Sequence, residues 1–418
     1  MSVQPRRSWY RGVGETGGIG RGRLGPCRGA QVAVLAALAF SGCDFFDGEA
    51  EKRRILSELE LELTPMANGA EDLAQRSTGW WVLIQALQAD VLQAAEPEPD
   101  PGWDYLGFLE RGWNQARQLA SVVEERLHRE LELEDAESHP LMAQVRWATG
   151  LAELYLGMTF CETVLDEELL SDRQLYRRAE QSLGLAIETA RRAGSAHYLN
   201  AALAGRAQTL MLLEDWDGAE SDAMEVPAGF SYVSYHIEGD PNPLVFWIQQ
   251  GSVGFLHKWW PLVEESEDPG FMIDPRSGEE DHRIPVHYDG GTLAGSEIPH
   301  YRPLKYVSSE DDIPVVHYDM AQLIIAEAKA VRGDFDGATA VLNRLRAAVG
   351  LPPHDVPATA EQMEELILWE RFAELHLEGQ RLIDLHRKGL MERVFEELDD
   401  PERPGVGRPS KWGECDGG

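Results

Sequence analysis

Catalytic chemistry needs a nucleophile, a base or paired acids at a recognisable spacing, and this sequence has none of the familiar arrangements. It lacks GxSxG, HExxH, a P-loop and the protein-kinase set. Cys161 is the one thiol expected to be buried, and no base lies near it in the sequence. The 72 Asp and Glu residues make carboxylate pairs suited to glycoside hydrolysis so common that such a pair carries no information. We therefore predict that the protein is not an enzyme.

Metal and cofactor sites are also poorly supported. The acidic residues at 264–268, Asp274 and 279–281 could offer oxygen ligands to calcium, but they lack EF-hand spacing, which favours a solvated loop. The GxGxxG match at residues 12–17 follows no strand, which excludes a dinucleotide site. The cysteines, which form no CxxC pair or zinc spacing, are Cys27, Cys43, Cys161 and Cys415. We expect no metal, no cofactor and no disulfide framework.

The charge of the chain argues against a nucleic-acid partner. The formal net charge is -34, whereas phosphate binding needs clustered Lys and Arg. Residues 1–42 differ from the rest, because they contain six Arg and one acidic residue. We expect a solvated acidic surface on the remainder of the chain.

The N-terminal residues have the organisation of a secretion signal. A basic leader is followed by an apolar run at residues 32–40 and by Ser41-Gly42-Cys43. The run is too short for a transmembrane helix, which needs about 20 apolar residues. Small residues before a cysteine resemble the bacterial lipobox, with Phe40 in place of the usual aliphatic residue. The sequence therefore predicts a signal segment at 1–42 and lipidation of Cys43, which anchors the protein to a membrane.

Helical periodicity dominates the rest of the chain. It covers residues 49–93, with breaks expected near Thr64-Pro65 and Asn68-Gly69, and ends in a Pro-rich linker at 96–102. The later helical segments are 103–132, 140–157, 173–193, 196–213, 321–331 and 360–388. These segments predict a mainly α fold.

An internal repeat indicates how some of these helices pair. Glu214-Asp215-Trp216-Asp217-Gly218-Ala219 is echoed by residues 333–338, and each copy follows an Ala-rich helix. Both copies are typical of helical hairpins and resemble tetratricopeptide pairs, although no strict 34-residue period runs through the chain. The sequence thus predicts a scaffold of a few tetratricopeptide-like hairpins.

Periodicity disappears between residues 226 and 314, where Gly, Pro and aromatic residues become frequent. Loops of this length usually carry function, so this irregular, loop-rich insertion is the first place to expect a ligand. The predicted organisation is therefore a leader at 1–42, an N-terminal helical part with hairpins at 43–225, the insertion at 226–314, C-terminal hairpins at 315–399 and a flexible tail at 400–418.

Two blocks near the C-terminus carry a family resemblance. The first, residues 370–389, reads ERFAELHLEGQRLIDLHRKG, and the second runs from Tyr318 through residues 323–328 and 342–346 to Leu351. Weaker echoes are residues 274–276, 302–306 and 202–216. Together they resemble the SusD/RagB family. From helical spacing we expect the charged residues of the first block to form ion pairs and hold the fold together: Glu370, Glu374, Arg381 and Asp384.

The resemblance implies a lipid-anchored protein at the outer surface of the outer membrane, which binds an oligosaccharide or other nutrient and delivers it to a SusC-like TonB-dependent transporter. The family often binds glycans on aromatic side chains, since sugar C–H faces pack on flat rings. The candidate ligand-binding residues here are Trp80, Trp81, Trp103, Tyr105, Trp247, Trp259, Trp260 and Tyr301. We assign Trp113, Trp147, Trp216 and Trp369 to packing, because they lie within helical patterns.

Two other functions stay open at this stage. One is a tetratricopeptide-type envelope scaffold that binds a protein partner, which should bury the candidate tryptophans and offer a concave helical face. The other is a secreted glycan-processing enzyme, which should bring carboxylates together in a pocket. A nutrient receptor should instead show an aromatic cluster that faces solvent.

Overall fold

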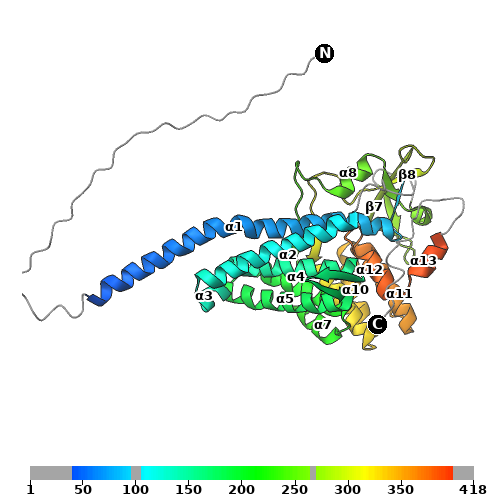
Figure 1. Ribbon diagram of the computed structural model, residues 1–418. Helices are drawn as coiled ribbons and strands as arrows, with labels where there is room; N and C mark the ends of the chain where they lie inside the picture. Colours follow the sequence, from blue (N-terminus) through cyan, green and yellow to red (C-terminus); the bar gives the residue numbers. More distant parts are fainter. Residues whose placement is uncertain (1–39, 96–104, 264–269, 399–418) are drawn as a thin grey trace, which may run out of the picture. The chain divides into compact units, whose positions relative to one another are not determined.

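The structure is a computed structural model that describes residues 40–95, 105–263 and 270–398 (Figure 1). The chain divides into two compact units, residues 1–59 and 60–418, and every contact discussed below lies within the second. Most of the predicted leader and the predicted tail, including residues 1–39 and 399–418, lie outside the described residues. No helix in the part of the chain that the structure describes is both long enough and apolar enough to cross a membrane.

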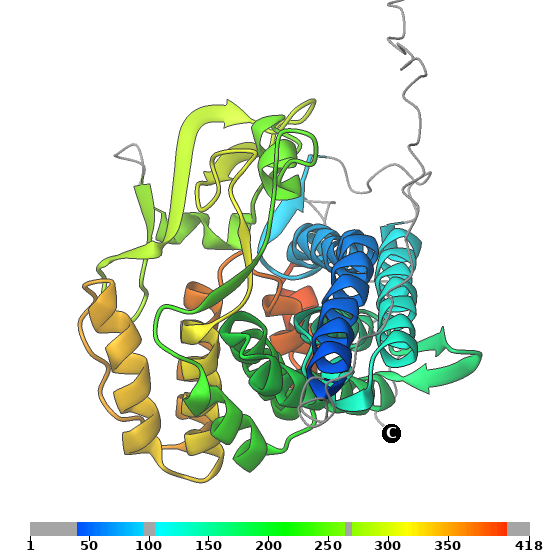
Figure 2. The ribbon, with the colours of Figure 1, turned by 90° about the vertical axis from the view of Figure 1, so that its left-hand side faces the viewer.

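The second unit is built on antiparallel helices that pack in chain order, which confirms the predicted mainly α fold (Figures 1 and 2). Helix α4 (Pro140–Thr159) lies between α2 (Tyr105–Glu130) and α5 (Asp172–Ala193). A Cβ at Gly150 of α4 would lie only 2.6 Å from Leu183, so glycine lets these two helices approach closely. A short helix, α3 (Leu133–Glu137), joins α2 to α4.

The repeat forms the two predicted hairpins. Helix α6 (Ala196–Leu212) pairs with α7 (Trp216–Glu225), and α9 (Tyr318–Val331) pairs with α10 (Phe335–Ala348). In each second helix an aspartate caps the N-terminus: Asp215 accepts from the Gly218 N–H, and Asp334 from the Gly337 N–H. Because α7 also packs on α9, the two hairpins stack on each other as tetratricopeptide pairs do.

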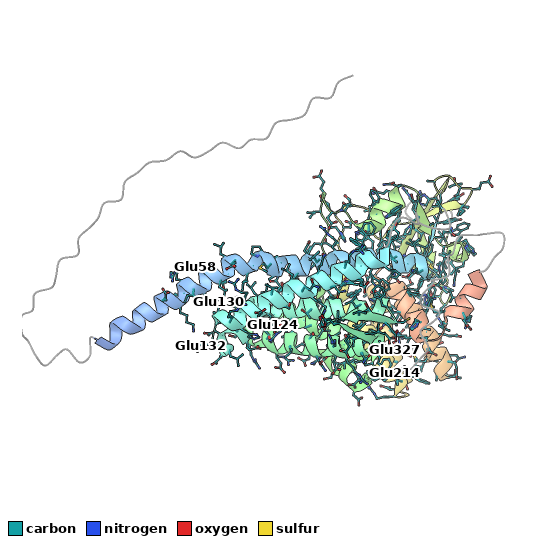
Figure 3. The ribbon with its side chains drawn as sticks, in the orientation of Figure 1. Glu58, Glu124, Glu130, Glu132, Glu214 and Glu327 are labelled. Carbon is teal, nitrogen blue, oxygen red and sulfur yellow. The ribbon has the colours of Figure 1, made fainter. Side chains whose placement is uncertain are left out.

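Several acidic side chains lie near the end of α2 and on the connection to α4. Glu130 and Glu132 are exposed, while Glu124 pairs with Arg146 of α4 at 2.8 Å (Figure 3). Arg146 also pairs with Glu137 at 2.7 Å, so one buried guanidinium joins α2, α3 and α4. The negative charge at this end of the helices therefore includes ion pairs that fix helix to helix as well as solvated carboxylates.

The expected breaks near residues 64–69 are wrong, because α1 (Phe40–Gln88) continues through Pro65. Side chains on both sides of the proline are held to neighbouring helices: Glu62 pairs with Arg126 at 3.0 Å, and Asn68 accepts a 2.9 Å hydrogen bond from Gln144. Tertiary contacts of this kind override the local cost of a proline inside a helix. A short strand, β1 (Leu92–Ala94), follows the helix.

The loop-rich insertion contains several strands, a short helix and a 3-10 turn. Strands β6 (Gly270–Ile273), β7 (Glu280–Thr292) and β8 (Pro299–Pro303) form one antiparallel sheet. Strand β4 (Ser231–Ser234) pairs with β9 (Ile313–His317), and β1 pairs with β5 (Val253–Phe255). The remaining elements are α8 (Pro243–Gln249), the 3-10 turn η1 (His257–Leu262) and, outside the insertion, the hairpin β2 (Glu162–Leu165) and β3 (Glu168–Ser171). The pairing of β1 with β5 fixes the insertion to the end of α1.

The prediction of one continuous helix over residues 360–388 is wrong, because the chain leaves the helix between Glu374 and Arg381. Helix α11 (Ala360–Glu374) ends before a tight turn, and α12 (Arg381–Arg387) and α13 (Met391–Leu398) follow. Leu377 and Gly379 have φ values of 55° and 76°, which no helix accepts. A Cβ at Gly379 would lie 3.2 Å from Val82, so the turn packs directly against α1.

Candidate functional site

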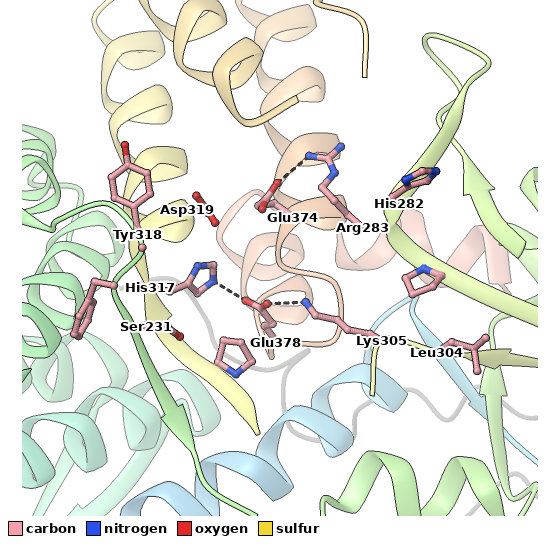
Figure 4. A pocket seen from close by; sticks show the side chains of 14 residues that line it. Ser231, His282, Arg283, Leu304, Lys305, His317, Tyr318, Asp319, Glu374 and Glu378 are labelled. Carbon is pink, nitrogen blue, oxygen red and sulfur yellow. Dashed lines mark hydrogen bonds and ion pairs between the residues drawn. The ribbon is translucent and has the colours of Figure 1, made fainter. Parts of the chain in front are cut away.

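A polar pocket of about 530 Å³ lies where the insertion meets the C-terminal hairpins (Figure 4). Strand β7 supplies His282 and Arg283 to its wall, and Lys305 follows β8. The remaining charged or titratable wall residues come from the start of α9 and the end of α11: His317, Asp319, Glu374 and Glu378. Phe230 and Tyr318 add aromatic surface. Pockets of this size accommodate small molecules.

Glu378 forms the centre of one side of the pocket. Its carboxylate accepts from Lys305 Nζ at 2.6 Å and lies 2.8 Å from His317 Nε2 (Figure 4). Burial alone would raise the pKa of Glu378, but the charges of Lys305 and His317 outweigh it and lower the pKa to about 2. Burial lowers the pKa of His317, and the Glu378 carboxylate outweighs it, so the pKa of His317 rises. The three groups form a buried ionic cluster in which Lys305 and His317 share one carboxylate.

The opposite side of the pocket has an excess of negative charge. Arg283 donates to Glu374 Oε2 at 3.1 Å, but the same guanidinium also pairs with Asp281 at 2.7 Å and Glu370 at 2.8 Å. Burial raises the pKa of Glu374, and the negative charges of Asp319 and Glu378 raise it further against the effect of Arg283. Asp319 lies beside Glu374 (Figure 4). Glu374 therefore shares Arg283 with two other acids, and Asp319 adds a further negative charge beside it.

Behind this wall, the first family block is held by buried ion pairs, but most of them join residues distant in sequence and not residues at the helical spacing that we expected. Glu370 pairs with Arg346 of α10 at 2.7 Å, and Arg346 pairs with Asp274 at 2.7 Å. Asp384 lies 2.8 Å from Arg371. These contacts join the insertion, α10 and α11 into one charged core.

Two further pairs extend the same core. Arg381 donates two hydrogen bonds, of 2.6 and 2.8 Å, to the carboxylate of the fully buried Asp90, and Lys258 donates a third at 2.8 Å. Arg387 pairs with Glu327 of α9, which is labelled in Figure 3. Most of these partners lie far away in sequence rather than one helical turn away. Of the four charged residues that we expected to hold the fold together, Glu374 also lines the pocket.

Two of the eight aromatic candidates, Trp260 and Tyr301, stack on each other in the insertion. Trp260 stacks on Tyr301 with ring centroids 4.8 Å apart, and Tyr301 stacks on Tyr288 at 4.5 Å. Tyr301 is buried between two half-buried rings, and we call this stack of Trp260, Tyr301 and Tyr288 the aromatic ladder. The indole N–H of Trp260 donates to the Phe255 carbonyl at 2.9 Å, which fixes its orientation. The neighbouring Trp259 does not join this stack, because its ring stacks on Phe372 of α11 with centroids 4.7 Å apart.

Like Trp259, the other five candidates do not join the ladder. Trp80 is half-buried and meets Phe108 edge-on at 6.2 Å, and Trp81 is fully buried. Tyr105 is half-buried at the start of α2, Trp247 is half-buried on α8, and Trp103 lies outside the described residues. The tryptophans assigned to packing follow that prediction: Trp113 and Trp147 are fully buried, and Trp216 and Trp369 pack partly buried against the core.

None of the eight aromatic candidates lines the polar pocket. Its charged residues Arg283, Lys305, His317 and Asp319 were not among the expected site residues. The sequence did hold a signal for some of the pocket residues. Lys305 lies within the 302–306 echo, and Glu374 and Glu378 lie within the first family block. The sequence predicts a structural role for the family blocks, yet Tyr318, Glu374 and Glu378 within them also line the pocket.

The described residues contain no group of three or more His, Cys, Asp or Glu that could hold a metal ion. Cys161 is half-buried and disulfide-bonded, so the expectation of a buried free thiol there is wrong. Disulfides persist mainly in oxidising compartments.

Comparison with known proteins gives one family and one fold. Residues 309–404 match the model of the SusD family. A SusD superfamily protein from Bacteroides vulgatus superimposes with a TM-score of 0.65 at 15% identity, over 82% of this chain and 90% of that one. A SusD-like carbohydrate-binding protein from Bacteroides fragilis gives 0.60 at 18% identity, over 81% and 87%. A second SusD-like carbohydrate-binding protein, from Bacteroides vulgatus, gives 0.53 at 15% identity, over 78% and 83%. No curated protein matches the chain.

Proposed function

We propose that this chain is a member of the SusD family, and that it is a non-catalytic receptor that binds a carbohydrate or related nutrient and delivers it to a TonB-dependent outer-membrane transporter. The observation that carries this proposal is the SusD-like fold over 82% of the chain. Two solved structures with the same fold are described as carbohydrate-binding proteins.

The aromatic ladder supports carbohydrate as the ligand. The C–H faces of a sugar ring are apolar and pack well on an aromatic face, while its hydroxyls need polar groups at the rim. Trp260 and Tyr288 are both half-buried, so each retains some surface that solvent reaches. The stack also holds each ring in place before a ligand arrives, which lowers the entropy lost on binding.

Replacing the outer rings of the ladder tests this part of the proposal. We expect Trp260→Ala and Tyr288→Ala each to weaken retention on an immobilised oligosaccharide panel roughly tenfold. Trp216→Ala is the matched control, because Trp216 is a half-buried aromatic residue at the α6–α7 turn. Trp259 suits the test less well, since its ring packs on Phe372. Unchanged retention by both ladder variants, with wild-type unfolding, would remove the ladder from the binding site.

We also propose that Cys43 is lipidated and anchors the protein at the outer membrane, with the ligand site exposed at the cell surface. The apolar run and the small residues before Cys43 support this proposal. The disulfide at Cys161 fits an exported protein, since thiols in the cytosol are kept reduced. Cys43→Ser should release the protein from the membrane fraction into the soluble fraction. Continued sedimentation of the variant with membranes would refute the anchor.

The transporter partner is tested by purifying the native protein from detergent-extracted membranes and identifying the proteins that accompany it by mass spectrometry. We expect a TonB-dependent transporter among them. Recovery of soluble envelope proteins in its place would favour a tetratricopeptide-type scaffold, the alternative for which the stacked hairpins α6–α7 and α9–α10 are the relevant observation.

A further inference from the structure

We propose that the polar pocket is a second ligand site, separate from the aromatic ladder, and that it binds a compact amino sugar through the charged amino group of the sugar. This inference rests on the proposed carbohydrate function but concerns other residues. Nothing in the ladder requires the pocket, because none of the three ladder residues lines it.

The first argument is the state of the cations. Arg283 pairs with Asp281, Glu370 and Glu374, so its donors already face carboxylates. Lys305 donates to Glu378 and to the carbonyl oxygen of His376 at 2.7 Å. A ligand anion would have to compete with these buried partners. The cationic residues of the wall are therefore poorly placed to recruit an anionic ligand.

The second argument is the state of the acceptors. Glu374 uses Oε2 for Arg283, and within the described residues no donor reaches its Oε1. No hydrogen bond or ion pair to the Asp319 carboxylate is formed by the described residues either. Burial raises the pKa of Glu374, Arg283 opposes this, and the negative charges of Asp319 and Glu378 raise the pKa further, as expected for acids that lie close together. An ammonium group between Glu374 and Asp319 would relieve the repulsion between their charges and form charge-assisted hydrogen bonds.

The third argument is the space and chemistry around this pair. The cavity of about 530 Å³ fits a molecule the size of a small sugar rather than a bare ion. An ammonium nitrogen has three N–H donors, and Lys305 uses two of its own, so one further Lys305 N–H can meet a ligand hydroxyl. Tyr318 and Phe230 provide apolar surface for the ring. An amine at the Asp319 side, with hydroxyls toward Lys305, matches this distribution of groups.

The probes that test the proposal are glucosamine, glucose and N-acetylglucosamine, compared by isothermal titration calorimetry at mildly acidic pH. Glucose lacks the amine, and acetylation removes the charge while it keeps the sugar ring. We expect glucosamine to bind roughly tenfold more tightly than either. Equal binding of the three sugars, or no binding of glucosamine, would overturn the proposal.

Asp319→Asn should abolish the preference for glucosamine. Asp336→Asn is the matched control, because Asp336 is exposed and holds the same second position of helix α10 that Asp319 holds in α9. Both substitutions remove one negative charge from a helix N-terminus, so they cost similar helix stability. If Asp319→Asn leaves the preference intact, the pocket is not the amine site. Oligosaccharide retention by the ladder is measured on the same variants, so failure of this site can be told apart from failure of carbohydrate binding.

Discussion

The Asp90–Arg381 pair offers a direct measure of how much the family block contributes to stability. Asp90 is fully buried, and the side chain of Arg381 is 15% exposed. Burial alone would raise the pKa of Asp90, but Arg381 and Lys258 outweigh it and hold the pKa well below its ordinary range. Removal of one partner of such a pair leaves a buried charge without compensation and typically costs about 3–5 kcal/mol.

Arg381→Met keeps most of the aliphatic side chain and removes the charge. Because Lys258 still contacts Asp90 at 2.8 Å, we expect a loss near the lower end of that range, about 3 kcal/mol. Unfolding entropy of about 2.1 cal/mol/K per residue, over roughly 350 residues, converts this loss into a fall in Tm of about 4 °C. Differential scanning calorimetry and urea unfolding both measure the change.

Arg191→Met is the control, because the Arg191–Glu225 pair is about half exposed on each side and should contribute less than about 1 kcal/mol. The double variant Asp90→Asn with Arg381→Met should lose less stability than the sum of the two single variants, since it leaves no buried carboxylate unpaired. Equal losses for Arg381→Met and Arg191→Met would refute the view that this buried pair holds α12 to the end of α1.

Three further outcomes follow from particular residues. Gly379→Ala should lower stability by about 1–3 kcal/mol in urea unfolding, because φ is 76° and the new Cβ would lie 3.3 Å from Trp81. Burial first and the charge of Lys305 next lower the pKa of His376 to about 3, so its contribution to stability is fully present above about pH 6.5 and is lost as the pH falls toward 3. His376→Phe should therefore remove about 2 kcal/mol of the loss that the wild type shows between pH 7 and pH 5, and identical pH profiles would contradict this. Asp334→Ala, which removes the cap on α10, should cost about 1 kcal/mol in the same unfolding assay, and no loss would mean that the cap is dispensable.

The sequence predicted the helical hairpins well because the signals for them are local. Apolar residues at helical spacing located most helices to within a few residues, and the repeat located the two hairpins, whose Asp-x-x-Gly caps form within four residues of chain. The C-terminal family block was also recognisable, because its residues are contiguous in the sequence. Each of these signals depends on neighbours along the chain, which a sequence displays directly.

Pro65 and Gly379 show where local rules fail. Pro65 should break a helix, yet contacts on both sides of it keep α1 continuous. Gly379 lies in a segment with strong helical spacing, yet its backbone is left-handed because the turn packs against Val82. In both cases the energy of tertiary packing exceeds the local preference, which amounts to about 1–3 kcal/mol.

The site depended most on the tertiary structure. The sequence supplied Trp260 and Tyr301 as separate aromatic candidates, but only the pairing of β7 with β8 stacks Tyr301 on Tyr288. Arg381 finds its partner 291 residues away at Asp90. The polar pocket likewise joins β7, α9 and α11, which are distant in the chain. The sequence by itself thus determined most helices, the two hairpins and the family block, whereas the tertiary structure decided which charges meet. Ion pairing and cavity shape depend on distances in space, and a pattern along the chain does not encode those distances.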